Sequence, residues 1–423
     1  MAFKRRSFRH TYINLLLLII FLLMMSACGS TPAEATPDTN PIVGVIPTEP
    51  QEPVQIITDT AAPEPEPTAV INTETAIKST ATAAEPAQAA INPLTGLAVS
   101  DPESLDLPPA LVAMSNFPVS LRPQSGLSAA SIVYEFYIGE GMTRLLAFFL
   151  GDLGDIKIGP VHTGRLPDES LRQLHQGFLV NSGGSGNVTR NLYHETTLHA
   201  KTETEIGKIM ISGDELTAVA ENEKETLDKM GPGGMKFDPA IPEDGKKADS
   251  FWLMYSYPNQ IIWRYDKTSG GYQRYQDKGD AVTFEQINDR LTDEPLVYEN
   301  VIIMFTEHYA KYETLIDLYF TFYDKEPAFL LRDGQMYKIY WSTRNTQAER
   351  ESGKSKPIRF IDYDGDLFPL KPGQTWIEIV QPGTPTWESI DSEIYYDRVN
   401  KKEKGSGHWS MIYEPPQPIL DTP

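Results

Sequence analysis

The chain has 423 residues, with 58 Asp and Glu against 37 Lys and Arg, a net charge of −21 and a single cysteine. This acidic balance argues against nucleic-acid binding, because neutralising phosphates requires a basic surface. A single cysteine excludes an internal disulfide framework and zinc clusters built from several cysteines.

The first 27 residues have the pattern of a lipoprotein signal peptide. Four basic residues precede an uninterrupted apolar run from Leu15 to Met25, which is shorter than the about 20 residues that span a bilayer. The following Ser26-Ala27-Cys28-Gly29 resembles a bacterial lipobox. This resemblance implies cleavage before Cys28 and attachment of lipid, such as palmitate, to that residue. Two or more acyl chains would hold the protein on the outer, extracytoplasmic face of the cell membrane. An ordinary cleaved signal with a coincidental cysteine is the alternative.

Residues 28–90 are predicted to form a disordered tether. The stretch after Cys28 holds ten prolines and nine acidic residues, and it lacks Phe, Tyr and Trp. Such a composition buries too little apolar surface to offset the entropy of ordering. As a flexible coil it would extend roughly 45 Å, which would space the folded part from the membrane.

The first folded half, residues 91–240, is predicted to be an α/β domain. Gly139-Glu-Gly141 joins two apolar runs as a turn, and Gly177 is suited to a left-handed helix cap. The expected elements are two strands, a helix, a short buried strand and a second helix, over residues 131–138, 143–150, 167–176, 178–180 and 214–230.

The second half, residues 248–415, is predicted to be an antiparallel β-rich domain, which makes the fold class mixed, or α+β. Turn signals such as Asp333-Gly334 separate runs of aromatic and β-branched residues. Strands are expected over residues 260–265, 272–275, 328–331, 335–341, 358–363, 367–368 and 374–380.

Familiar catalytic and metal motifs fail simple spacing tests. His194 and His199 are five residues apart, whereas a zincin helix needs histidines four apart. Gly183-Gly-Ser185-Gly-Asn187 misses the nucleophile-elbow pattern at its last position. We therefore expect no metal and no other cofactor, and no catalytic residue is named.

Arginines and a glycine-rich loop in the first half form the remaining candidate ligand site. Arg122, Arg144 and Arg165 each lie beside a turn or strand end, and guanidinium groups suit carboxylate or phosphate. Strand ends gather at one edge of an α/β sheet, so we expect these side chains to converge on one concave face. The alternative is that the arginines pair with Glu135, Asp152 or Asp155 and hold the domain together. The candidate set is completed by Asn116, Gln124, Ser125, Glu135, Gly183, Gly184 and Ser185.

Several longer motifs carry a family resemblance. They include Asn92-Pro-Leu-Thr-Gly-Leu97, Val112-Ala-Met-Ser-Asn116, Arg122-Pro-Gln-Ser-Gly-Leu-Ser128, Ile132-Val-Tyr-Glu135, Gly141-Met-Thr-Arg144, Ile158-Gly-Pro-Val161, Asn181-Ser-Gly-Gly-Ser185 and Pro372-Gly-Gln-Thr-Trp-Ile377. With these motifs the chain resembles the YerB-like bacterial lipoproteins, whose N- and C-terminal domains are of unknown function (DUF3048). The resemblance implies an envelope lipoprotein and no particular reaction.

Two departures from that family pattern stand out. His162-Thr-Gly-Arg165 replaces the usual Arg-Ser-Ala-Arg, and Asn181-Ser182 replaces the usual His-Ala. A family activity that needed that histidine or first arginine would be absent here.

Two functional classes remain open from the sequence. One is a non-catalytic, membrane-anchored module that binds an anionic envelope ligand or a protein partner. The other is an enzyme acting on an anionic cell-wall or lipid-linked pyrophosphate substrate. The binding module is favoured because the sequence offers no identifiable nucleophile or acid–base pair.

Overall fold

The computed structural model describes residues 90–418, apart from 152, 193–196, 200–202, 206–207, 228–233, 321–323 and 345–357. The expected signal peptide (1–27) and all but the last residue of the tether (28–90) therefore lie outside the described residues, with Cys28. The same is true of His194 and of the end of the predicted helix at 228–230.

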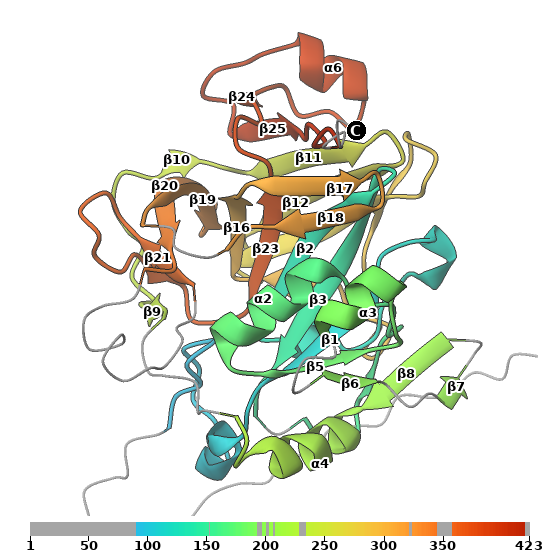
Figure 1. Cartoon of the computed structure of the whole chain (residues 1–423). Coiled ribbons are helices and arrows are strands. Elements are labelled where there is room, and N and C mark those ends of the chain that lie inside the picture. The colour runs from blue at the N-terminus through green and yellow to red at the C-terminus, as the bar shows by residue number, and fades with distance from the viewer. Residues whose placement is uncertain are drawn as a thin grey trace, which may run out of the picture. The chain divides into compact units, whose positions relative to one another are not determined.

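An 11-stranded mixed sheet forms the centre of the fold (Figure 1). Its strands are β1 (Ala110–Ser115), β2 (Ile132–Gly139), β3 (Met142–Phe149), β5 (Phe178–Asn181), β6 (Thr197–His199), β10 (Lys246–Lys247), β16 (Asn300–Phe305), β19 (Glu326–Arg332), β20 (Gln335–Ser342), β21 (Arg359–Ile361) and β23 (Thr375–Val380). The spatial order is β10-β20-β19-β16-β23-β2-β3-β1-β5-β6, and β21 pairs with β20. Strands from both sequence halves thus share this sheet.

A second, seven-stranded sheet packs on one face of the large sheet. It contains β11 (Ser250–Ser256), β12 (Asn259–Asp266), β13 (Gly271–Asp277), β14 (Phe284–Gln286), β15 (Val297–Tyr298), β24 (Thr386–Glu388) and β25 (His408–Ile412). Aromatic side chains fill the space between the layers: Trp263 of this sheet lies 5.3 Å, centroid to centroid, from Trp376 of the large sheet.

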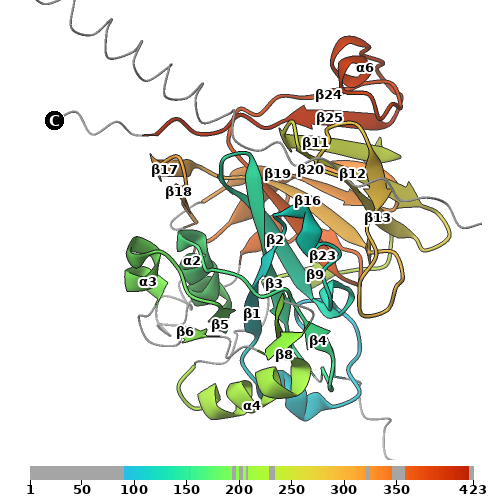
Figure 2. The same cartoon turned by 90° about the vertical axis from the view of Figure 1, so that its right-hand side faces the viewer.

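Helices α2 (Leu166–His175) and α3 (Gly186–Leu192) cover the opposite face of the large sheet (Figure 2). Leu171 and Val188 on these helices pack against apolar side chains of β2 and β3. The hairpin of β17 (His308–Tyr312) and β18 (Leu315–Leu318) covers part of the same face. The remaining elements are η1 (Pro102–Asp106), η2 (Val119–Leu121), η3 (Leu127–Ala129), β4 (Lys157–Ile158), β7 (Glu203–Glu205), β8 (Lys208–Ser212), α4 (Gly213–Glu223), β9 (Lys236–Phe237), β22 (Pro369–Leu370) and α6 (Tyr395–Asn400).

Strands β2 and β3 lie in the middle of the large sheet, and their sequences are largely apolar. All eight residues of β2 and seven of the eight in β3 are buried, because both faces of the sheet are covered by other elements. Glu135 and Arg144 are the charged residues in these strands. The burial of these two charges therefore requires partners or another specific reason.

Helix α2 ends one residue earlier than expected from its glycine. Gln176, with φ of 52°, adopts the left-handed cap conformation in place of Gly177. Gly177 is required for another reason: a Cβ there would lie 2.3 Å from Leu111 and 2.4 Å from the Pro109 carbonyl oxygen. The predicted cap position was thus wrong by one residue.

The predicted difference in secondary structure between the two halves is present in a coarser form. The described residues are β-rich overall, with α2, α3 and α4 in the first half and mainly strands after residue 250. However, 91–240 and 248–415 do not have separate sheets, since β23 of the second half lies between β16 and β2 and runs parallel to both. None of the described helices has the length and apolar character needed to cross a membrane.

Candidate functional site

The predicted site residues lie near one edge of the large sheet. β1 and β5 run parallel and end at Ser115 and Asn181. Arg144 lies near the start of antiparallel β3, opposite Ser115. The segment leading to α2 follows the same edge, because the His162 amide donates to the Ala113 carbonyl at 2.8 Å and the Ser182 amide donates to the His162 carbonyl at 3.0 Å.

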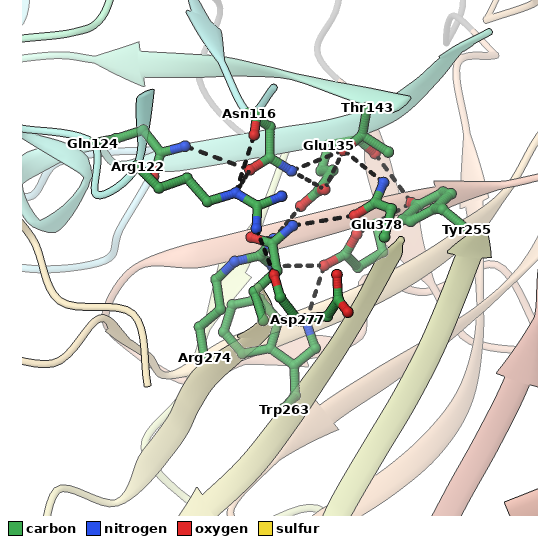
Figure 3. A network of polar contacts seen from close by, with 12 residues as sticks. Asn116, Arg122, Gln124, Glu135, Thr143, Tyr255, Trp263, Arg274, Asp277 and Glu378 are labelled. Atoms are coloured by element: carbon green, nitrogen blue, oxygen red, sulfur yellow. Dashed lines mark hydrogen bonds and ion pairs between the residues drawn. The ribbon is translucent and has the colours of Figure 1, made fainter. Parts of the chain in front are cut away.

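Four of the predicted residues join a buried network between the two large sheets (Figure 3). The Asn116 amide nitrogen donates to Glu135 Oε1 at 2.9 Å and to Thr143 Oγ1 at 2.8 Å. Arg122 donates through Nε to Asn116 Oδ1 at 3.2 Å. The Gln124 amide donates to the Ser115 carbonyl at 2.8 Å. We call this group, together with the residues of the second sheet that it contacts, the interlayer network.

Arg274 on β13 is the centre of the interlayer network (Figure 3). Its Nη2 lies 2.7 Å from Glu135 Oε2 and its Nη1 lies 3.2 Å from Glu378 Oε1. The guanidinium also stacks on Trp376, 4.3 Å from the ring centroid. Burying the charges of Arg274 and Glu135 is tolerable because they pair with each other and make further hydrogen bonds.

Glu378 completes the network with donors from the second sheet. Oε1 accepts from Trp263 Nε1 at 2.9 Å, and Oε2 accepts from the Tyr255 hydroxyl at 3.1 Å. Burial raises the pKa of Glu378 to about 8, and the charge of Glu135 is the second largest cause of this rise. The two carboxylates share one guanidinium. All four carboxylate oxygens of Glu135 and Glu378 have donors, so we interpret the interlayer network as structural.

Arg122 is a member of the interlayer network whose guanidinium nitrogens have only some of their hydrogen-bond partners. Nη1 donates to the Asp277 carbonyl at 2.7 Å, and the guanidinium lies 4.6 Å from the Phe117 ring centroid. Nη2 is buried without a partner. Burial, and next the charge of Arg274, lower the pKa of Arg122 to about 10.

A second group of polar residues lies on the other face of the large sheet. Thr143 and Arg144 are consecutive on β3, and consecutive side chains of a strand point to opposite faces. Thr143 belongs to the interlayer network, so Arg144 projects toward α2. We define the Arg144 cluster as Arg144, Arg165, Asp168 and His162, whose charges act on one another, together with Asn181. Asn181 ends β5 and precedes Ser182, the residue bonded to His162.

Four members of the Arg144 cluster interact electrostatically, namely Arg144, His162, Arg165 and Asp168. Burial, and next the charge of Arg165, lower the pKa of Arg144 to about 9. Burial, followed by Arg144 and Arg165, lowers the pKa of His162 to about 4, which keeps the imidazole neutral at pH 7. Burial raises the pKa of Asp168 to about 7, although both arginines oppose that rise. The two guanidinium charges are therefore incompletely neutralised.

Unpartnered polar atoms distinguish the Arg144 cluster. Arg144 is 3% exposed, and its Nε and Nη1 have no hydrogen-bond partner. The same is true of Arg165 Nε, Asp168 Oδ1 and Asn181 Nδ2. An unsatisfied buried polar group costs about 1–3 kcal/mol, and more when it is charged. Buried polar groups normally have a partner, so each of these atoms requires an explanation.

The glycine-rich loop connects this cluster to the surface. Asn181 Oδ1 accepts from the Gly183 amide at 2.8 Å, and Gly183 has φ of 106°, a conformation that favours glycine. Gly184 follows it, and Ser185 is exposed. Gly183, Gly184 and Ser185 therefore form the rim beside the buried Asn181.

The prediction that all three arginines converge on one face was wrong. Arg144 and Arg165 lie together, whereas Arg122 lies in the interlayer network on the opposite face. Glu135 pairs with Arg274 and with none of the three. Ser125 belongs to neither group: its hydroxyl donates to the Lys157 carbonyl at 2.6 Å.

Sequence reasoning missed several members of these groups. Asp168 is not among the candidates named from the sequence, yet its Oδ2 accepts from the Arg165 amide at 2.8 Å. Its position three residues after a helix start is typical of this cap. Arg274 could have been found as a charged residue on an inward position of β13, between Tyr272 and Gln276. His162 and Asn181, noted only as departures from the family pattern, both belong to the Arg144 cluster.

A serine–histidine contact elsewhere does not match a catalytic triad. Ser250 Oγ lies 2.9 Å from His408 Nδ1. Asp391 Oδ1 is 3.9 Å from that same Nδ1, whereas a triad places the serine and the carboxylate on different ring nitrogens. Within the described ranges, no group of three or more His, Cys, Asp or Glu side chains is arranged to hold a metal ion.

A hollow of about 530 Å³ lies near the start of the folded part and is lined by Asn92, Thr95, Ser128, Glu299 and Gln374 among others. Its polar groups bond to one another: the Gln374 backbone N–H donates to Glu299 Oε2 at 2.7 Å. None of its lining side chains is among the buried unpartnered groups of the described residues. The Arg144 cluster is therefore the stronger candidate for a ligand.

Comparisons with known proteins agree with the family resemblance. The DUF3048 N-terminal domain, of unknown function, matches residues 94–225, and the DUF3048 C-terminal domain matches residues 253–377. YerB of Bacillus subtilis (strain 168), which its name describes as a candidate lipoprotein, is 26% identical over 307 residues, covering 68% of this chain and 85% of YerB. The crystal structure of the Bacillus subtilis YerB protein shares the fold, with a TM-score of 0.55 and 23% identity over 69% of this chain and 96% of that one. The chain is thus a member of the DUF3048 family, which includes YerB-like proteins.

Proposed function

We propose that this protein is a lipid-anchored envelope protein that binds an anionic ligand at the Arg144 cluster. The observation that carries this proposal is the Arg144 guanidinium, which is almost completely buried and has no hydrogen-bond or ion-pair partner among the described residues. An anion would supply the missing acceptor and the missing negative charge.

The alternative of a purely structural role fits Arg144 poorly. A structural buried arginine in this same protein, Arg274, makes two ion pairs and stacks on aromatic rings. Arg144 instead lies near a second arginine, which lowers the pKa of Arg144 further. Like charges placed together in a buried position are destabilising unless a ligand compensates them.

The net charge of the protein also favours a local cationic cluster. With a net charge of −21, the molecule as a whole repels anions. Arg144 and Arg165, accompanied by one carboxylate whose pKa is raised to about 7, reverse the sign of the field locally. Asn181 Nδ2 adds a neutral donor.

Binding of inorganic phosphate to the full-length chain in detergent micelles tests this function by isothermal titration calorimetry. Arg144→Ala should weaken phosphate binding at least about tenfold, because a hydrogen bond to a charged group contributes about 1.5–3 kcal/mol. Arg264→Ala is the matched control, since Arg264 pairs with Asp391 and Glu393 at the surface of the other sheet. Equal affinities for the wild type and Arg144→Ala would contradict the proposal.

The proposed anchor is Cys28, which would carry the lipid on the outer face of the membrane. The signal pattern of residues 1–27 and the similarity to YerB, a candidate lipoprotein, support this location. Metabolic labelling with a tagged fatty acid should mark the wild type and leave Cys28→Ala unmarked. Equal labelling of both chains would refute the anchor without affecting the anion site.

A further inference from the structure

The Arg144 cluster does not consist of donors alone. Arg144, Arg165 and Asn181 contribute unpartnered N–H groups, whereas Asp168 contributes Oδ1, an unpartnered acceptor. Asp168 is completely buried, so bulk solvent does not reach this oxygen. A ligand that completes the cluster must therefore both accept and donate hydrogen bonds.

The backbone fixes the orientation of Asp168. Its Oδ2 accepts from the Arg165 amide at 2.8 Å and thereby caps α2. This bond prevents the carboxylate from turning both oxygens toward the arginines, and no ion pair joins Asp168 to Arg144 or Arg165 among the described residues. In the ionised form, which predominates above pH 7, Oδ1 is thus held as an acceptor beside a group of donors.

We propose that the cluster takes an anion bearing a neighbouring hydroxyl group, of the class of polyol phosphates. The anionic oxygens would accept from Arg144, Arg165 and Asn181, and the hydroxyl would donate to Asp168 Oδ1. This inference rests on the anion-binding function proposed above and adds the chemical class of the ligand.

The hydroxyl group of the ligand would determine the selectivity of the site. A phosphate without a hydroxyl would place a negative charge near Asp168 and leave Oδ1 unsatisfied. A site built to hydrogen-bond a hydroxyl discriminates strongly against an analogue that lacks it, because its own polar group then stays unpaired. The donors alone would accept any anion of suitable size.

Two probes with the same three-carbon skeleton test the assignment. sn-Glycerol 3-phosphate carries hydroxyl groups and n-propyl phosphate carries none. Calorimetry on the full-length chain in micelles at pH 8 keeps both phosphates and Asp168 mainly ionised, because the pKa of Asp168 is raised only to about 7. The wild type should bind glycerol 3-phosphate at least about tenfold more tightly.

The variant Asp168→Asn tests whether the preference for glycerol 3-phosphate depends on Asp168 Oδ1. The amide oxygen of the new residue keeps the cap on the Arg165 amide, while its NH₂ group replaces the Oδ1 acceptor by a donor. The preference for glycerol 3-phosphate should therefore disappear or reverse in favour of propyl phosphate. Glu169→Gln is the matched control in the same helical turn, because Glu169 pairs with Arg172 and bonds to no member of the cluster. Its charge raises the pKa of Asp168, so the control keeps Asp168 ionised at pH 8. This control should keep the wild-type preference.

The possible results separate the two proposals. Equal affinity of the wild type for both probes, lost in Arg144→Ala, would overturn the hydroxyl inference and leave the anion site standing. Binding of neither probe would overturn both proposals. A preference retained in Asp168→Asn would overturn the role of Asp168, and the wild-type comparison decides the inference if that variant does not fold.

The same chemistry occurs in phospholipid headgroups and in water-soluble or wall-bound phosphates. Vesicles of phosphatidylglycerol, compared with vesicles of phosphatidylcholine, distinguish these sources. Displacement of glycerol 3-phosphate by the phosphatidylglycerol vesicles would identify a lipid headgroup as the ligand. Absence of displacement, with the soluble probe still bound, would identify a phosphate outside the bilayer.

Discussion

The interlayer network and the Arg144 cluster begin at adjacent residues of β3 and bury their arginines to a similar degree. Arg274 is 2% exposed and Arg144 is 3% exposed. Arg274 has two carboxylate partners and two aromatic neighbours, whereas Arg144 has no hydrogen-bond or ion-pair partner among the described residues. Burial alone therefore does not distinguish the structural Arg274 from Arg144, for which we propose a ligand, whereas the hydrogen bonds of the two guanidinium groups do.

Replacing Arg274 gives the largest expected effect. Arg274→Met would leave Glu135 and Glu378 buried without their shared cation, so we expect the free energy of unfolding to fall by about 3–5 kcal/mol. Urea denaturation of the full-length chain, followed by tryptophan fluorescence, measures this change. A loss below 1 kcal/mol would mean that the interlayer network does not hold the sheets together.

The same substitution at Arg144 sharpens the comparison. Arg144→Met removes an uncompensated buried charge and fills the space with an apolar chain of similar length. We expect the free energy of unfolding without ligand to stay constant or to rise by up to about 2 kcal/mol. A loss comparable to that of Arg274→Met would show that Arg144 has a structural partner and would end the distinction between the two regions.

The pH dependence of stability offers a smaller test of the interlayer network. Because the pKa of Glu378 is raised to about 8, the folded state keeps a proton that the unfolded state releases near pH 4.5. The free energy of unfolding should therefore fall as the pH rises between these values, by up to about 1.4 kcal/mol per pH unit, and level off above pH 8.

Glu378→Gln isolates this contribution from other titrating groups. Burial lowers the pKa of His175 to about 3 and that of His308 to about 4, so these histidines make stability rise with pH up to about 6.5. Their effect is common to both proteins and cancels in the comparison. Asp168, whose pKa is raised to about 7, makes stability fall with rising pH up to that value in both proteins. The variant should therefore lose the decline between pH 7 and 8, and parallel curves for the two proteins would contradict the assignment.

Local sequence patterns predicted many elements because they depend on neighbouring residues. β2, β3, β5, α2, β12, β20 and β23 begin and end within one or two residues of the expected positions. β1 and β16 were missed although they are fully buried, since short apolar runs carry no periodicity that separates them from other buried segments.

The candidate site was predicted only in part, for a physical reason. The presence of Arg144, Arg165 and the loop from Gly183 to Ser185 near one sheet edge follows from strand ends and turns. The separation of Arg122 from Arg144 depends on which face each side chain occupies. The partnership of Glu135 with Arg274, 139 residues away in the chain, depends on how two sheets pack. Neither relation is encoded in a local motif.

The position of β23 between β2 and β16 has a consequence for synthesis. Ile132 of β2 is paired in register with Thr375 of β23, so one edge of β2 stays without its neighbour until residue 375 has been made. Contacts between such distant segments form slowly, and a long apolar strand edge invites pairing with another chain. Chains that stop before residue 375 should consequently aggregate, and a nascent chain would depend on chaperones until its last strands arrive.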